Sequence, residues 1–271
     1  MGRLSIEEAI EIGIMKPRHL IDSWDEISRR IRQGRRIVLL SDFDGTLVRI
    51  HRSPEEVQLS PPVQNLLAAI SRRGLTVGIV SGRSLGDLRA RVGVKRIWYV
   101  GTHGLSVRPP SGPTRFLATP EQKKAVARAR RELSRQLNGS EGIYLEPKDA
   151  ALAVHYRNAP WRSRLHALGV VRAVARSLPG LRLLKGKQVW ELLPDSQDGK
   201  WGGVQHILRQ APAKRRLVFY LGDDASDEEV FEHLRGITVA VGKRRQTCAH
   251  YFLSSAAEVR HFLNKVLEAV T

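Results

Sequence analysis

The sequence predicts an α/β fold: a Rossmann-like core with a parallel sheet, interrupted by an inserted α/β cap domain. Apolar runs that end in polar residues recur at residues 37–41, 76–80, 97–101 and 217–221, and the patterns between them include amphipathic helices. Strands buried on both faces of a parallel sheet have this composition, because helices cover both sides of the sheet. After the third run the pattern changes to an αββαββ order, which predicts the insertion.

These patterns divide the chain into residues 1–35, an N-terminal helical extension; 36–112, the first part of the core; 113–193, the cap; and 194–271, the second part of the core. In the extension, Leu20, Trp24, Ile27 and Ile31 recur at helical spacing, and Gly34 ends the predicted helix. The cap begins with a capping-box pattern at residues 119–122, with proline at the first helical position.

Composition limits the class of protein. The 271 residues contain one cysteine, Cys248, so neither an intramolecular disulfide nor a thiol cluster for zinc is expected, and a cytoplasmic location follows. Residues 1–16 do not resemble a signal peptide, and no apolar run approaches the length of a membrane span. We therefore expect no membrane association.

The formal net charge of +18 is the most unusual property of the composition. Such a charge can indicate a nucleic-acid or membrane-surface partner. Here the basic residues are spread over several segments, few aromatic residues lie among them, and no nucleic-acid motif occurs. We expect no nucleic-acid partner and interpret the charge as solvated faces that also attract an anionic substrate. A non-catalytic polyanion-binding protein stays open as the distant alternative.

The segment Asp42-Phe43-Asp44-Gly45-Thr46-Leu47 follows the first apolar run directly. Ligands of open α/β sheets collect beyond the carboxyl ends of the strands, and two neighbouring carboxylates repel each other unless a cation binds them. A polar turn would also explain aspartate and glycine at this point. These two carboxylates alone do not decide between a site and a turn.

Further polar residues follow the other predicted strands. Ser81-Gly82 leads into a helix and could hold a phosphate through its hydroxyl and backbone N–H groups. His103 follows the third strand, where it could be a base or a structural residue. Lys200 opens a helix after the cap. An acidic segment, residues 222–229, follows the last of the four runs, and a helix dipole alone does not explain its first two aspartates.

The strings DFDGTL, SGRS and GDDASDE, together with Lys200, resemble in order the motifs of the haloacid dehalogenase-like superfamily of phosphotransferases. The resemblance implies that Asp42 is the nucleophile and Asp44 the general acid/base. Ser81, Gly82 and Lys200 would bind the phosphate, and Lys200 would also pair with the nucleophile. It further implies a Mg²⁺ ion held by Asp42, the Asp44 backbone carbonyl and Asp223, with Asp224 and Asp227 orienting water or neighbouring groups.

Within this superfamily, GDDASDE and the His103-Gly104 pair resemble the trehalose-phosphatase family, although threonine is usual there at Ser226. Three cap strings, at residues 146–148, 154–157 and 187–191, resemble the same family. The resemblance implies hydrolysis of trehalose 6-phosphate and a functional link to a trehalose-phosphate synthase. The implied sugar-binding residues are Glu146, Lys148, Lys187, Glu191, His103 and Arg157.

Two other interpretations of the charged cap residues and of the substrate remain. Any single charged residue there could belong to a surface ion pair, for example Lys187 with Glu191. The substrate could also be another sugar phosphate, of the sucrose-phosphate or mannosyl-phosphoglycerate type, because the same fold hosts many substrates.

Overall fold

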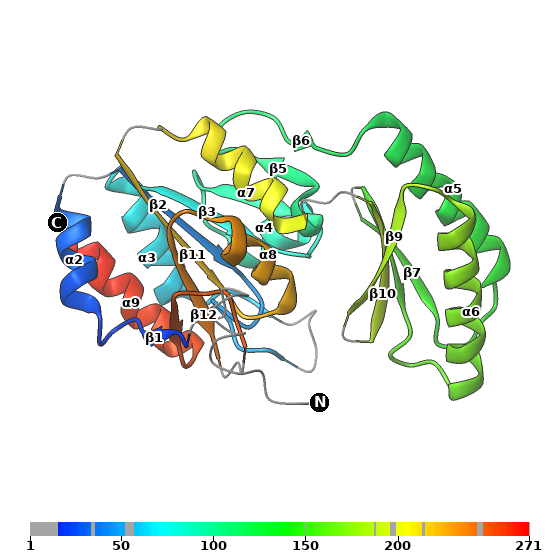
Figure 1. The fold of residues 1–271 in the computed structure, drawn as a ribbon. Helices are drawn as coiled ribbons and strands as arrows, with labels where there is room; N and C mark the ends of the chain where they lie inside the picture. Colours follow the sequence, from blue (N-terminus) through cyan, green and yellow to red (C-terminus); the bar gives the residue numbers. More distant parts are fainter. Residues whose placement is uncertain are drawn as a thin grey trace, which may run out of the picture. The chain divides into compact units, whose positions relative to one another are not determined.

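The computed structural model describes residues 16–33, 36–51, 57–148, 150–186, 188–195, 199–212, 215–242 and 246–270. The chain divides into two compact units, which we call the core unit (Met1–Thr114 with Asp198–Thr271) and the cap unit (Arg115–Gln197) (Figure 1). The predicted α/β fold with an inserted α/β unit is confirmed. Lys187 lies outside the described residues, as do residues 1–15, 34 and 35 of the predicted extension.

The core unit is built on a sheet with the strand order β1-β13-β12-β11-β2-β3-β4-β5-β6. The core unit supplies β1 (Arg18–His19), β2 (Arg36–Asp42), β3 (Thr76–Val80), β4 (Trp98–Gly101), β5 (Ser106–Arg108), β11 (Arg216–Gly222), β12 (Ile237–Val241) and β13 (Tyr251–Leu253). The edge strand β6 (Arg115–Phe116) consists of the first two residues of the cap segment. The pairs from β1 to β4 are parallel. Strands β2 and β11 are neighbours although the cap unit separates them in sequence, so the residues that follow both strands meet at one edge of the sheet.

Helices cover both faces of this sheet, which explains why its central strands are apolar throughout. On one face lie α2 (Trp24–Arg32), α3 (Pro61–Arg72), α4 (Leu85–Val92) and α9 (Ala256–Ala269). On the other lie α7 (Gly199–Gln210) and α8 (Ala225–His233). Alternate residues of β2 enter the two cores: Leu39 packs in the first and Leu40 in the second. The strands are thereby fixed, and the loops at their carboxyl ends rest on a rigid frame.

The described part of the N-terminal extension is not wholly helical, which corrects the prediction. Arg18 and His19 form strand β1, parallel to β13, and the Leu20 N–H donates to the Phe252 carbonyl at 3.0 Å. The helix begins only at Trp24, so Leu20 lies outside it, although its side chain is fully buried. The physical reason is that β13 would otherwise present an unpaired edge, and β1 covers it.

The cap unit has its own antiparallel sheet, in the order β7-β8-β10-β9. Its elements are α5 (Pro120–Gln136), β7 (Tyr144–Lys148), β8 (Ala151–His155), α6 (Trp161–Ser177), β9 (Leu181–Gly186) and β10 (Val189–Pro194). Figure 1 shows α5 and α6 on the same side of this sheet. The predicted capping box is present: the Thr119 hydroxyl accepts from the Gln122 N–H and the Gln122 side chain accepts from the Thr119 N–H.

The faces of the cap sheet differ in chemistry. Leu152, Val154 and Trp190 point toward the helices and form the apolar core of the unit. Glu146 and Glu191 both pair in register with Ala153, and therefore lie on the opposite face. The sequence placed the cap between residues 113 and 193, whereas the compact unit spans Arg115–Gln197 and β10 continues through Pro194.

Among the described residues, none of the helices has the length and apolar character needed to cross a membrane.

Candidate active site

Two strand ends bring the first carboxylates together. Asp42 is the last residue of β2, and Asp223 directly follows β11, its parallel neighbour. Gly45 lies against Asp223: a Cβ at residue 45 would sit 2.0 Å from the Asp223 Oδ2, and the φ of +87° also disfavours any side chain there. The Thr46 hydroxyl donates to Asp223 Oδ1 at 3.4 Å. The turn after β2 is therefore shaped to receive the carboxylate after β11.

Lys200, in the first turn of α7, links the nucleophile candidate to the acidic loop. Its ammonium lies 2.7 Å from Asp42 Oδ1 and 2.8 Å from Asp227 Oδ1, and the side chain is almost fully buried. Burial lowers the pKa of Lys200, but Asp227 and Asp42 outweigh burial and raise that pKa well above its usual value. The lysine stays charged, and its ammonium is fixed beside Asp42.

Asp227 is a fully buried carboxylate that accepts four hydrogen bonds. Its Oδ1 accepts from Lys200 and from the Tyr220 hydroxyl, at 2.8 and 2.6 Å. Its Oδ2 accepts from the backbone N–H groups of Asp223 and Asp224, both at 3.0 Å. A buried charge is tolerated only with such partners, so Asp227 holds the loop between β11 and α8 in place.

Asp224 caps α8, and its partly exposed carboxylate lies at the edge of this cluster, with Oδ1 3.8 Å from the Lys200 ammonium. Its Oδ1 accepts from the Ser226 N–H at 2.8 Å and from the Ser226 hydroxyl at 2.6 Å. Although burial opposes the change, Lys200 and the Ser226 hydrogen bonds lower the pKa of Asp224 to about 2. The hydroxyl at residue 226 therefore serves the cap of α8.

A divalent cation fits the acidic edge of the sheet. Among the described residues, Asp42, Asp223 and Asp227 offer carboxylate oxygens that all lie within 4.8 Å of one another. Asp227 already accepts two donors on each oxygen, which leaves Asp42 and Asp223 as the better ligands. Burial raises the pKa of Asp42 well above its ordinary value, and Lys200 offsets only part of the rise. Burial, with Asp227 and Asp224 nearby, raises the pKa of Asp223 to about 7. A hard cation with oxygen ligands would relieve this repulsion.

Asp44 is held by an arginine of the next loop. Arg83 donates from Nε to Asp44 Oδ2 at 2.6 Å and from Nη2 to Oδ1 at 2.8 Å, a bidentate pair. The Arg83 Nη1 donates to Asp87 at 2.8 Å, and Arg91 donates to the same carboxylate at 2.7 Å. Despite its burial, the hydrogen bonds that Arg83 donates to Asp44 and Asp87 raise the pKa of Arg83 well above its usual range. This network fixes the direction of the Asp44 side chain.

The predicted phosphate loop lies against His103. The His103 N–H donates to the Ser81 carbonyl at 3.2 Å, and the Thr102 N–H donates to the Arg83 carbonyl at 2.7 Å. A Cβ at Gly82 would lie 2.5 Å from the His103 ring, so only glycine allows this approach. Thr102 and His103 both have φ of 52°, a left-handed conformation that costs a non-glycine residue of order 1 kcal/mol or more. The structure thus places His103 beside the loop at residues 81–83, within the core unit.

The cap residues form pairs on the open face of their sheet. Glu146 lies 2.8 Å from His155, whose ring is 5.8 Å from that of Tyr144. Lys148 donates to Glu191, whose side chain is buried. Glu191 thus forms an ion pair with Lys148, and Lys187 lies outside the described residues. Arg157 is exposed, in the turn after β8.

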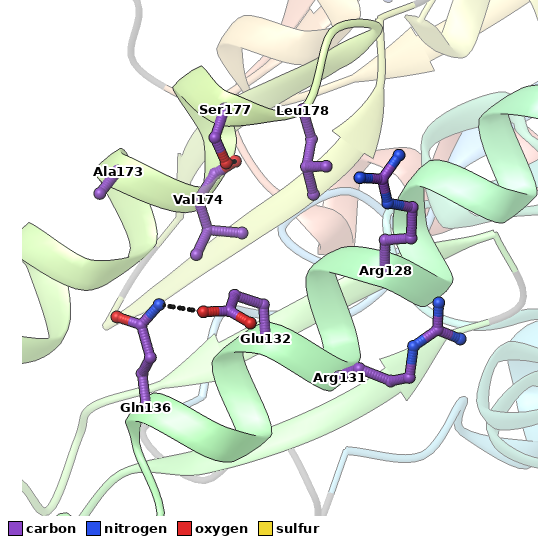
Figure 2. Close-up of a pocket in the computed structure, with 8 residues that line it drawn as sticks. All are labelled: Arg128, Arg131, Glu132, Gln136, Ala173, Val174, Ser177 and Leu178. Atoms are coloured by element: carbon purple, nitrogen blue, oxygen red, sulfur yellow. Dashed lines mark hydrogen bonds between the residues drawn. The ribbon is translucent and has the colours of Figure 1, made fainter.

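The cap unit also contains a cavity of about 490 Å³ between α5 and α6. Figure 2 shows Arg128, Arg131 and Glu132 lining it from α5, and Val174 and Ser177 from α6. None of the predicted site residues lines this cavity, which belongs to the helical layer of the cap.

The family model for trehalose-phosphatases matches residues 40–266 of this chain. The chain belongs to the trehalose-phosphatase family. It is 32% identical over 247 residues to a trehalose-phosphate phosphatase of Mycobacterium tuberculosis, covering 86% of this chain and 62% of that relative. It is 30% identical over 260 residues to a probable trehalose-phosphate phosphatase of Oryza sativa subsp. japonica, covering 92% of this chain and 70% of that one. The chain thus spans less than two thirds of the mycobacterial relative.

Solved structures share the fold. The C-terminal domain of the Candida albicans trehalose-6-phosphate phosphatase aligns with a TM-score of 0.74 at 20% identity, covering 94% of this chain and 99% of that one. The Aspergillus fumigatus trehalose-6-phosphate phosphatase aligns with a TM-score of 0.67 at 22% identity, covering 93% and 99%. The family assignment rests on the sequence matches, and these structures support the architecture.

The structure of this trehalose-phosphatase family member adds three partners of predicted residues that the sequence did not single out. Arg83 pairs with Asp44, Tyr220 with Asp227, and His155 with Glu146. Arg83 and His155 lie within two of the family-like strings, SGRS and residues 154–157, which are the sequence signal for them. Tyr220 lies in a strand that otherwise reads as apolar, where a single hydroxyl is the only signal.

Proposed function

We propose that this protein is a Mg²⁺-dependent phosphatase that hydrolyses trehalose 6-phosphate to trehalose and phosphate. The observation that carries the proposal is the buried chain of contacts from Asp42 through Lys200 to Asp227 and on to the backbone of Asp223. A carboxylate beside a fixed ammonium, next to a second carboxylate, suits attack on a phosphate dianion. Family membership and the names of the relatives support the substrate.

In the first step, a carboxylate oxygen of Asp42 attacks phosphorus and the bond from phosphorus to the sugar oxygen breaks. Asp44 gives its proton to that oxygen, and the phosphoryl group stays on Asp42. In the second step, Asp44 takes a proton from water, whose oxygen attacks phosphorus and releases phosphate and free Asp42. Asp42, Asp223 and the Asp44 carbonyl would hold Mg²⁺, which would supply the positive charge that lets the phosphate dianion approach Asp42.

The residues around the two aspartates divide the remaining work. Lys200 neutralises charge on Asp42 and the phosphate oxygens, and Ser81 with the Gly82 backbone binds the far oxygens. The bidentate pair with Arg83 fixes the direction of the Asp44 carboxylate.

The cap residues would recognise the sugar. Glu146, Lys148 and Glu191 offer charged acceptors and donors on one face of the cap sheet, suited to neutral hydroxyls. We assign the same role to Lys187, Arg157 and His103. Together these residues would bind the sugar ring that lies far from the phosphate.

The proposal places the protein in the cytoplasm, where a lone thiol such as Cys248 stays reduced. Its substrate must be supplied by a glycosyl transfer to a hexose 6-phosphate, the reaction of a trehalose-phosphate synthase. No direct contact with such an enzyme is required by this scheme.

A substrate panel tests the proposal. Phosphate release would be measured from trehalose 6-phosphate, sucrose 6-phosphate, mannosyl-phosphoglycerate and glucose 6-phosphate, each with and without Mg²⁺. The expected result is Mg²⁺-dependent release with the highest kcat/KM for trehalose 6-phosphate. A higher kcat/KM for any other member would refute the substrate, and no release from any of them would refute the activity.

A further inference from the structure

Tyr220 carries a buried hydroxyl in strand β11, where the other residues from 217 to 221 are apolar. The side chain is fully buried on the α7/α8 face of the sheet, with its ring 5.9 Å from that of Phe231. Its hydroxyl donates to Asp227 Oδ1 at 2.6 Å. A phenylalanine would fill the same space without the cost of burying an oxygen, so the hydroxyl needs its own explanation.

The contact is directed at the residue that organises the acidic loop. Asp227 Oδ1 has two donors, Tyr220 and Lys200, while Oδ2 holds the N–H groups of Asp223 and Asp224. Burial and the nearby Asp227 carboxylate raise the pKa of Tyr220 well above its ordinary value, so the hydroxyl keeps its proton and remains a donor. Tyr220 is thus the neutral side chain among the four donors that surround Asp227.

The ammonium of Lys200 is shared between two carboxylates. It lies 2.7 Å from Asp42 and 2.8 Å from Asp227. If Asp227 Oδ1 lost the Tyr220 hydroxyl, Lys200 would be its only remaining donor there, and the ammonium would be drawn toward Asp227 and away from Asp42. The carboxylate of Asp227 could also rotate, and the backbone of Asp223 would then move with it.

We propose that Tyr220 is a positioning residue of the phosphatase site. By fixing Asp227, its hydroxyl keeps Lys200 on the Asp42 carboxylate and keeps the Asp223 carboxylate turned to the cation. This inference deepens the proposed function. The expected effect on kcat rests on the proposed function, whereas the expected effect on cation affinity does not depend on it.

The experiment compares Tyr220→Phe with wild type and with a matched control, Tyr99→Phe. Tyr99 is also a buried tyrosine of the core sheet, and its hydroxyl donates to the Val94 carbonyl at 2.5 Å, in the apolar core on the other face. Both changes remove one oxygen atom from one buried hydrogen bond. Three quantities are measured: Mg²⁺ affinity by calorimetry without substrate, kcat and KM on trehalose 6-phosphate and on an aryl phosphate, and the midpoint of thermal unfolding.

The expected result for Tyr220→Phe is a roughly fivefold weaker Mg²⁺ affinity and a kcat lower by about tenfold on both substrates, with KM nearly unchanged. Tyr99→Phe should lower the unfolding midpoint and leave Mg²⁺ affinity and kcat unchanged. If Tyr220→Phe keeps both the Mg²⁺ affinity and kcat within about twofold of wild type, the proposal is overturned. A wild type that binds Mg²⁺ yet releases no phosphate would refute the proposed function, while a weaker affinity in Tyr220→Phe would still support the positioning role.

A second pair of variants tests whether Tyr220 acts through Asp227. Asp227→Asn should reduce Mg²⁺ affinity and kcat more than Tyr220→Phe does. Because the hydroxyl acts only on that carboxylate, the double variant should be no worse than Asp227→Asn alone. Fully additive losses in the double variant would show that Tyr220 acts independently, and would overturn the proposal. This comparison also serves if Tyr220→Phe is less stable than expected.

Discussion

Asp227 of the core unit and the paired carboxylates of the cap unit differ in the kind of partners that hold them. In the core unit, Asp227 is fully buried and accepts four hydrogen bonds, one from Lys200 on α7 and three from residues 220–224. In the cap unit, Glu146 is partly exposed and has His155 beside it. Glu191 is buried and pairs with Lys148 across the sheet. Groups that must meet a reacting atom need fixed positions, whereas groups that read a ligand must be able to exchange partners.

Buried and exposed ion pairs also differ in how much free energy of unfolding is lost when one partner is removed. Breaking a buried pair leaves an uncompensated charge, which costs about 3–5 kcal/mol, whereas an exposed pair contributes about 0–1 kcal/mol. The core cluster therefore couples stability with chemistry, and the partly exposed pair of the cap can be altered at little cost to folding. The predictions below test this division.

The largest expected effect is loss of the nucleophile. Asp42→Asn keeps the size of the side chain but removes the charge that attacks phosphorus, so kcat should fall by about a thousandfold or more. The measurement is phosphate release, with thermal unfolding to verify the fold. Asp25→Asn, at an exposed aspartate of α2, is the control and should match wild type. A rate near that of wild type in Asp42→Asn would disprove the aspartyl-phosphate mechanism.

Cation removal should have a comparable effect on the core unit alone. Chelation should reduce phosphate release to background and added Mg²⁺ should restore it, because Asp42 and Asp223 lie side by side. Hydrogen exchange should show the change around β2 and β11, with the cap unit unaffected. Full activity after exhaustive chelation would remove the role assigned to Asp223.

The Mg²⁺ affinity of the core unit should depend on pH. The pKa of Asp223 rises from 3.8 to about 7 in the cation-free fold, so between these values the native state binds a proton that the unfolded chain has released. The contribution of Asp223 to the free energy of unfolding therefore stabilises the cation-free fold at low pH, and this contribution is lost as pH rises through about 7. The same proton competes with the cation, so Mg²⁺ affinity should fall by about tenfold per pH unit below neutrality. Calorimetric titrations at several pH values test this, and a constant affinity across the series would contradict it.

The smallest effect, and the most selective, belongs to the cap unit. Glu146→Ala should lower kcat/KM for trehalose 6-phosphate by about tenfold and leave hydrolysis of an aryl phosphate nearly unchanged, since that substrate has no distal sugar. Glu146 belongs to the partly exposed pair with His155, so the stability of the fold should change little. Glu132→Ala is the control, because it removes a carboxylate from the exposed pair with Arg135 on α5. Equal losses on both substrates would mean that Glu146 supports folding, and no loss would remove the argument for trehalose.

Much of the fold could be predicted because burial on both sheet faces leaves a continuous apolar run, and β2 shows that signature clearly. The positions of Asp42 and Asp223 follow from strand ends, a local property of sequence. Strand β1 was missed because two residues are too short to show an alternating pattern, and its pairing depends on β13, more than two hundred residues away.

The side-chain partners could not be predicted in the same way. Lys148 meets Glu191 through the register of three strands, over a separation of 43 residues. The bidentate contact of Arg83 with Asp44 spans 39 residues and depends on how two loops approach each other. Composition and periodicity describe single elements, and neither carries this information.

The place of the cap insertion has a consequence for the order of events during synthesis. The cap unit is one continuous segment and can pack its apolar core as soon as it leaves the ribosome. Strand β2 emerges earlier but must wait for β11, so one of its edges stays unpaired while more than 170 residues are added. Nascent chains halted after β10 should therefore protect cap amides from hydrogen exchange before those of β2. Chaperones would be expected to bind the unpaired edge of β2. Equal protection of the cap amides and the β2 amides would contradict this order of folding.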